Sequence, residues 1–209
     1  MTLSSTAIGV GKALDTSKYF ILSANYLGGC YGSTGPGSIN PATGREWGST
    51  FPHLSVADVL KSQTLLLDHL GIGQADVMGY SMGARVSAFL TIAHPDRVRR
   101  AVFAGLASRM ITGVGGAEAI ALALEAPSRA DVTDSGARAF RIFAEQTKSD
   151  LKALAACIRS SREKITVEEL ATIRVPVLVV AGDKDDVAGD VETLVRAIPG
   201  AQGVTLVNR

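Results

Sequence analysis

The chain has 209 residues, 46% of them hydrophobic, which is enough for one globular domain with a substantial core. A formal net charge of +1 excludes the broad basic surface of a nucleic-acid-binding protein, and the apolar runs are far shorter than the ~20 residues that span a bilayer. Two cysteines are too few for a disulfide framework, and the N-terminal residues lack the pattern of a signal peptide, so we expect a cytoplasmic protein.

Strands and helices are predicted to alternate along the chain. Short apolar runs predict strands at 19–24, 75–79, 98–106, 175–182 and 203–208. Apolar residues at helical spacing predict helices at 55–70, at 82–93, through most of 107–172, and in VETLVRAIPGA after residue 190. A Gly- and Pro-rich stretch at 25–53 predicts a long loop. This alternation predicts an α/β protein, a single domain with about five parallel strands.

The turn Gly79-Tyr80-Ser81-Met82-Gly83 fits the pattern G-x-S-x-G between a predicted strand and a predicted helix. In that context a tight turn raises the serine hydroxyl above the sheet edge. The N-terminus of the following helix points at the same place, where the Met82 N–H can stabilise an oxyanion. The sequence predicts Ser81 as a nucleophile, against the alternative of a glycine-flanked turn with an incidental serine.

The acid that would orient a base is expected just after a later strand. The stretch DKDDV after 175–182 offers Asp183, Asp185 and Asp186. We favour Asp185, although any of the three can also belong to a solvated acidic turn.

A histidine is expected after the acid, because the usual chain order is nucleophile, acid, base. None follows Asp185 in this sequence, whose histidines are His53, His69 and His94. His69 and His94 lie at predicted helix ends, and His53, in the long loop, is the only one mobile enough to act as a base from outside the usual position. The sequence therefore supplies no identifiable base.

No other motif predicts a binding site. The stretches AIGVGKA and GVGGAE do not fit phosphate-binding or dinucleotide-binding loops, and no Cys/His cluster has metal-ligand spacing. We expect no cofactor, no metal, no nucleic acid and no membrane partner. If the protein is active, its partner is a small-molecule acyl substrate.

The motifs GYSMG, HPDRVRRAVFAG and VPVLVVAGDKD resemble those of the α/β-hydrolase superfamily. Residues 73–209 resemble a bacterial hydrolase of that superfamily with a short helical cap at 107–160. Residues 7–72, with NYLGGCYGSTGPGSINPATG and FPHLSVADVLKSQTLLLDHLGI, resemble homoserine O-acetyltransferases, although those usually have G-G-S-M-G-G at the serine. We interpret the chain as a truncated domain or a chimera, natural or engineered, with a seam at 71–76.

The resemblance implies a partial fold, in which the first predicted strand corresponds to the fourth of the family's eight. The family's earlier strands, its second oxyanion N–H and its histidine loop have no counterpart here. Right-handed crossovers running one way place the helices mainly on one face of the sheet. An uncovered apolar face is then expected, with self-association as one way to cover it.

Three hypotheses about function remain open. The first is a serine-nucleophile hydrolase of ester or acyl substrates, impaired because no histidine follows the acid. The second is an acyltransferase resembling homoserine O-acetyltransferase. The third is a catalytically inactive fragment or engineered chimera.

Overall fold

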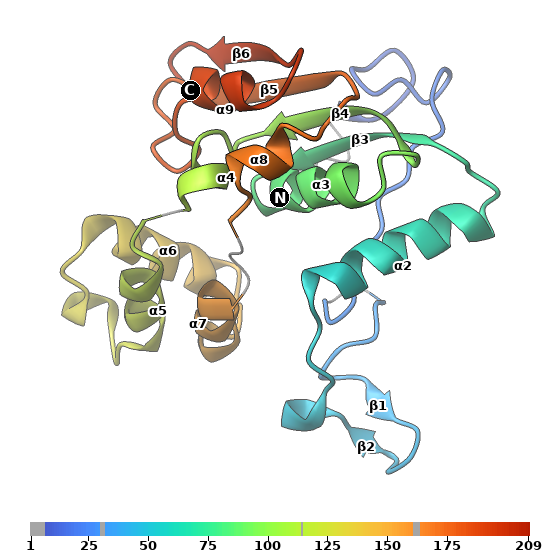
Figure 1. The fold of residues 1–209 in the computed structure, drawn as a ribbon. Coiled ribbons are helices and arrows are strands. Elements are labelled where there is room, and N and C mark those ends of the chain that lie inside the picture. Colours follow the sequence, from blue (N-terminus) through green and yellow to red (C-terminus); the bar gives the residue numbers. More distant parts are fainter. Residues whose placement is uncertain (1–6, 30–31, 114, 161–163) are drawn as a thin grey trace. The chain divides into compact units, whose positions relative to one another are not determined.

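The computed structural model describes residues 7–29, 32–113, 115–160 and 164–209. The chain divides into two compact units, Met1–Gln63 and Thr64–Arg209 (Figure 1). The predicted loop at 25–53 and the predicted helical region at 107–172 include residues 30–31, 114 and 161–163, which lie outside the described ranges.

The first unit is mostly irregular backbone with one small hairpin. β1 (Ile39–Asn40) pairs antiparallel with β2 (Arg45–Glu46), and a short 3-10 helix (Gly48–Thr50) follows. The ring of Trp47 packs edge-on against that of Phe51, with centroids 6.0 Å apart. Irregular backbone is what the Gly- and Pro-rich composition of this region predicts.

The prediction of a strand at 19–24 is wrong. Residues 19–26 have no regular secondary structure, and Tyr19 and Phe20 are 55% and 77% exposed. A strand is stabilised by hydrogen bonds to a neighbouring strand, and residues 19–24 belong to neither of the sheets in the described part of the chain.

α2 (Val56–His69) runs across the boundary between the two units. Its start is a capping box formed by Ser55 and Asp58. The Asp58 N–H donates to the Ser55 hydroxyl over 3.2 Å, and the Ser55 N–H donates to the Asp58 carboxylate over 2.8 Å. These bonds satisfy backbone donors that a helix start leaves without partners.

The second unit contains a parallel sheet of four strands in the order β3-β4-β5-β6. The strands are Ala75–Tyr80, Val98–Ala104, Val177–Gly182 and Gln202–Leu206. Each falls where a strand was predicted, so the α/β class is confirmed, with four strands in place of about five. Because the strands are parallel, the residues that follow them lie at one common edge of the sheet.

Helices cover one face of this sheet. α3 (Met82–Ala93) packs on β3 and β4, and α9 (Val191–Ala197) packs on β5 and β6. α8 (Val167–Leu170) contacts both helices (Figure 1). Under these helices Phe103 and Val179 are fully buried. On the other face, Tyr80 and Val204 are 67% and 42% exposed, which confirms the predicted one-sided arrangement.

Between β4 and β5 the chain is helical, as predicted. Its elements are α4 (Arg109–Thr112), α5 (Ala117–Glu125), a 3-10 turn (Arg129–Asp131), α6 (Ser135–Gln146) and α7 (Leu151–Ser160). α5, α6 and α7 pack around an apolar cluster that includes Ile120 and Leu124. Arg141 of α6 is only 6% exposed and donates to carbonyl oxygens at the end of α5. None of the helices in the described residues is both long and apolar enough to cross a membrane.

Candidate active site

Ser81 joins the end of β3 to the start of α3 in a strained conformation. Its backbone angles are φ 54° and ψ −116°, a region that residues other than glycine rarely occupy. The Ser81 N–H donates to the Ala104 carbonyl over 2.8 Å, which ties the turn to β4. Strain of this kind persists only where the surroundings hold it in place.

Glycines allow the close approach that makes this turn tight. A Cβ added to Gly79 would collide with the Gly83 carbonyl, so the end of β3 and the first turn of α3 fit together only with glycine at 79. Gly105, just after β4, has φ 62°, and a Cβ there would overlap the ring of Tyr80. Residues 79–83 therefore have the geometry that the G-x-S-x-G pattern predicts.

The first helical turn of α3 directs backbone donors toward this place. Ser81 is the N-cap residue of α3, but its side chain makes no capping hydrogen bond. Met82 is the first helical residue, so its N–H has no acceptor within the helix. Ser81, a half-buried residue, is therefore adjacent in the chain to a helix-start N–H without an acceptor in the helix.

Of the three aspartates after β5, Asp185 is half-buried, and Asp183 and Asp186 are exposed. One carboxylate oxygen of Asp185, Oδ1, accepts hydrogen bonds from the N–H groups of Val187 (3.1 Å) and Ala188 (3.0 Å). The second oxygen, Oδ2, has no hydrogen-bond partner among the described residues. Asp185 thus stabilises its own loop through Oδ1, and Oδ2 can still accept a hydrogen bond.

Ser81 and Asp185 lie at the same edge of the sheet, after β3 and β5 respectively. β4 lies between these strands, so the two strand ends are about 10 Å apart at the usual strand spacing. That distance is too long for a direct hydrogen bond between the side chains. A third group is needed to connect them.

The structure brings neither histidine of the second unit to this edge. His94 ends α3, whose 12 residues put it about 18 Å from Ser81 along the helix. His69 ends α2, ahead of β3, and so lies toward the opposite edge of the sheet. His53 is exposed and belongs to the first unit.

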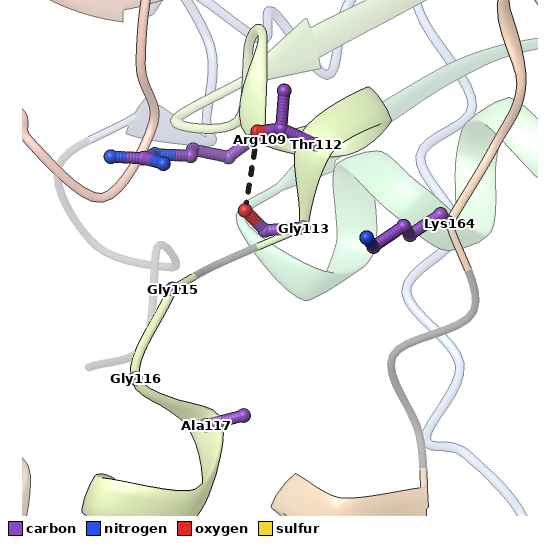
Figure 2. A pocket seen from close by; sticks show the side chains of 7 residues that line it. All are labelled: Arg109, Thr112, Gly113, Gly115, Gly116, Ala117 and Lys164. Atoms are coloured by element: carbon purple, nitrogen blue, oxygen red, sulfur yellow. Dashed lines mark hydrogen bonds between the residues drawn. The ribbon is translucent and has the colours of Figure 1, made fainter.

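A hollow of about 400 Å³ lies where the chain passes from α4 into α5 and returns ahead of α8. It is lined by Arg109, Thr112, Gly113, Gly115, Gly116, Ala117 and Lys164. Figure 2 shows Lys164 directed toward Gly113, where an added Cβ would approach its Cε to 3.0 Å. The hollow is open and combines glycine backbone with two basic side chains.

Sequence reasoning missed the side chains that hold the two loops of the site together. Arg85 is 3% exposed. In the segment after β4, the Ser108 N–H donates to Asp190 and the Ser108 hydroxyl accepts from Asp190, which lies in the loop after β5. Asp190, which caps α9, has its pKa lowered by the hydroxyl and N–H of Thr193. The one signal in the sequence is a charged residue, Arg85, among the small and apolar residues at the start of α3.

A family model described as the alpha/beta hydrolase fold matches residues 4–114, more than half of the chain. The chain therefore belongs to the α/β hydrolase fold family. This agrees with its parallel sheet and with its strand–serine–helix turn.

Curated relatives of this chain are homoserine acyltransferases. The homoserine O-succinyltransferase of Azoarcus sp. strain BH72 is 47% identical over 104 residues, and the homoserine O-acetyltransferase of Rhodospirillum rubrum is 49% identical over 98 residues. These matches take in 49% and 46% of this chain but only 28% and 25% of the relatives. The similarity thus spans about a quarter of each relative, and it is longer than the stretch 7–72 in which we predicted it. The seam at 71–76 stays a prediction.

Solved structures share the fold over nearly the whole chain. Esterase E22 matches 97% of this chain and 75% of its own with a TM-score of 0.69 and 21% identity. A homoserine O-acetyltransferase from Bacillus anthracis matches 97% and 74%, with a TM-score of 0.69 and 18% identity. At these identities the likeness shows the fold alone.

Proposed function

We propose that Ser81 is the nucleophile of an acyl-transfer site and that its ancestral reaction is ester hydrolysis. The observation that carries this proposal is the strained backbone of Ser81, held at a helix start with a hydroxyl that does no capping. The Ser81 Oγ attacks the acyl carbon, and the Met82 N–H donates to the oxyanion. The alcohol leaves with a proton, and water then releases the acid from the Ser81 ester.

Asp185 is proposed as the carboxylate that orients a base between the two strand ends. Two observations support this role. Oδ1 of its carboxylate is held by backbone N–H groups, which leaves Oδ2 to accept from a base, and β5 lies two strands from β3, which leads to Ser81. Because the histidines of the second unit lie elsewhere, we expect residues 1–209 by themselves to acylate slowly. Removing a base of this kind costs a factor of about 10⁶.

A second candidate is transfer of an acetyl or succinyl group to homoserine. It is favoured by the relatives, which are named homoserine O-acetyltransferase and O-succinyltransferase and are 47% and 49% identical where they match. In this reaction the hydroxyl of homoserine, in place of water, attacks the Ser81 ester. The two candidates share the first step and differ in the acceptor.

The test is labelling of the full chain with a fluorophosphonate, read by intact mass and peptide mapping, with and without imidazole in solution. We expect slow labelling at Ser81 that imidazole accelerates, since free imidazole can act as the base that neither His69 nor His94 is placed to supply. Ser81→Ala should abolish the labelling. Ser87→Ala is the matched control, because Ser87 is a buried serine of the same helix that lies outside the site.

Unlabelled protein that has been acetylated at Ser81 with an activated acetyl ester, with loss of its alcohol, then separates the two candidates. Release of the acyl group from an acetylated Ser81 into water supports hydrolysis, whereas release that depends on added homoserine supports the transferase. If folded protein stays unlabelled with imidazole, Ser81 is not activated and the chain is an inactive scaffold.

A further inference from the structure

Arg85 connects the helix that carries Ser81 to the segment after β4. It lies four residues beyond Ser81, one helical turn, and its side chain is 3% exposed. Its guanidinium donates from Nη1 to the Met110 carbonyl (3.2 Å) and from Nη2 to the Arg109 carbonyl (3.1 Å). A buried charge is costly unless it is fully bonded, so these bonds fix the position of residues 109–110 relative to α3.

The same segment is bonded to the loop that carries Asp185. The N–H groups of Ala107 (2.8 Å) and Arg109 (3.2 Å) both donate to the Ala188 carbonyl. The Ser108 N–H donates to the Asp190 carbonyl over 3.1 Å, and its hydroxyl accepts from the Asp190 N–H over 3.0 Å. Four hydrogen bonds therefore join residues 107–109 to residues 188–190.

Two further features keep residues 107–109 and 188–190 in close contact. Gly189 has φ 76°, and a Cβ there would collide with the Ser108 hydroxyl, so the two segments approach as closely as glycine allows. Ala188 is fully buried, and its N–H donates to the Asp185 carboxylate, while its carbonyl takes the bonds from residues 107 and 109. One residue thus links Asp185 to the segment that Arg85 holds.

We propose that Arg85 is a positioning residue that fixes the Asp185 loop relative to Ser81, acting through residues 107–110 and 188–190. Its effect on chemistry rests on the proposed function of Ser81 and Asp185. The mechanical link does not, because it consists of bonds among backbone groups, Arg85 and Ser108. This role requires no contact of Arg85 with a substrate or with the reacting hydroxyl.

The test measures amide hydrogen exchange of the full chain in Arg85→Met and Arg85→Lys, together with fluorophosphonate labelling of Ser81 in the presence of imidazole. Loss of the guanidinium bonds should raise exchange at Ala107, Arg109, Ala188 and Asp190 by about tenfold or more. Exchange at the buried strand residues Phe103 and Val179 should stay unchanged. Arg85→Lys, which retains a donor, should fall between Arg85→Met and the parent.

The matched control is Arg141→Met. Arg141 is also buried and also donates to backbone carbonyls, but those belong to α5 and not to the segment after β4. The Arg141→Met variant should raise amide exchange in α5 and leave amide exchange at residues 188–190 unchanged.

The two proposals fail in different ways. Unchanged exchange at 188–190 in Arg85→Met, or an equal rise across the whole sheet in both Arg85 variants, overturns the positioning role. Increased exchange at the loop with no labelling of Ser81 in any form leaves the positioning role standing and overturns the proposed function. Slower labelling with an unchanged loop shows that Arg85 acts by another route, which also overturns the inference.

Discussion

Ser81 adopts a backbone conformation that favours glycine. With φ 54° and ψ −116°, a serine there stores about 1–3 kcal/mol of strain. Glycine does not have this strain, although it gains more freedom in the unfolded chain, which offsets part of the benefit. A serine retained in such a place is what a functional hydroxyl would require.

Replacing Ser81 tests this balance directly. We expect Ser81→Gly to be more stable than Ser81→Ala by about 1 kcal/mol, since only alanine retains the strain. The order should reverse at Ser87, in the interior of the same helix, where glycine is the less stable by about 1 kcal/mol. Urea unfolding of the four variants gives both differences. An Ser81→Gly variant that is no more stable than Ser81→Ala would contradict the strained geometry.

Gly79 should be the most demanding glycine of the turn. A Cβ at this position meets backbone, the Gly83 carbonyl and the Ala84 nitrogen, and backbone cannot move aside as a flexible side chain can. We expect Gly79→Ala to lower the free energy of unfolding by more than about 2 kcal/mol. Gly73→Ala is the control, because a Cβ there meets nothing within 4 Å. Equal urea midpoints for the two variants would contradict the tight fit.

The elements show which parts of the structure were predictable from sequence. The helix 82–93 matches α3, and the strand 175–182 contains β5, because local periodicity and turn residues specify both. The run YFILSA has the same local signals but no partner strand, and pairing is decided outside the run itself. The bonds of Arg85 likewise join residues 24 and 25 positions away, so the pattern at 79–83 is visible in the sequence while the link to Asp185 is not.

The contact between α5 and α7 has a charge dependence that can be measured. Arg159 of α7 donates to the carboxylates of Glu118 and Glu125 on α5, and these bonds lower the pKa of both glutamates below the usual 4.5. A lowered pKa in the folded state means that the ion pairs stabilise the folded protein above pH 4.5. The stabilisation is lost as the pH falls through the pKa values of the folded state.

Arg159→Gln isolates this effect. The variant should unfold at a lower temperature than the parent near neutral pH, by a small margin because the groups are exposed. The difference in Tm should shrink as the pH falls below 4.5 and should also shrink at high salt. Thermal unfolding followed by circular dichroism over a pH series measures it. A difference that stays constant with pH would mean that Arg159 contributes through packing and not through charge.

The face of the parallel sheet that α3 and α9 do not cover, called the open face, leaves apolar side chains exposed. Tyr80, Ala104, Val180 and Val204 are successive partners in the strand register, so they form one row across this face. Met78 is 53% exposed in the adjacent row, and Leu206, at the far edge of the face, is 45% exposed. Parallel sheets are seldom left bare, and a contiguous exposed apolar surface favours association.

We propose that a second copy of the chain covers this face, and we expect the protein to associate as its concentration rises. Val204→Lys should weaken the association, because it places a charge at the end of the apolar row, beside Val180, without touching residues 79–83. Val10→Lys makes the same substitution at a residue that is 77% exposed and outside the sheet, so it should leave association unchanged. Sedimentation velocity over a range of concentrations, with the two variants side by side, measures the effect. A parent that stays monomeric, or a Val10→Lys variant that dissociates as readily as Val204→Lys, would show that the open face does not drive association.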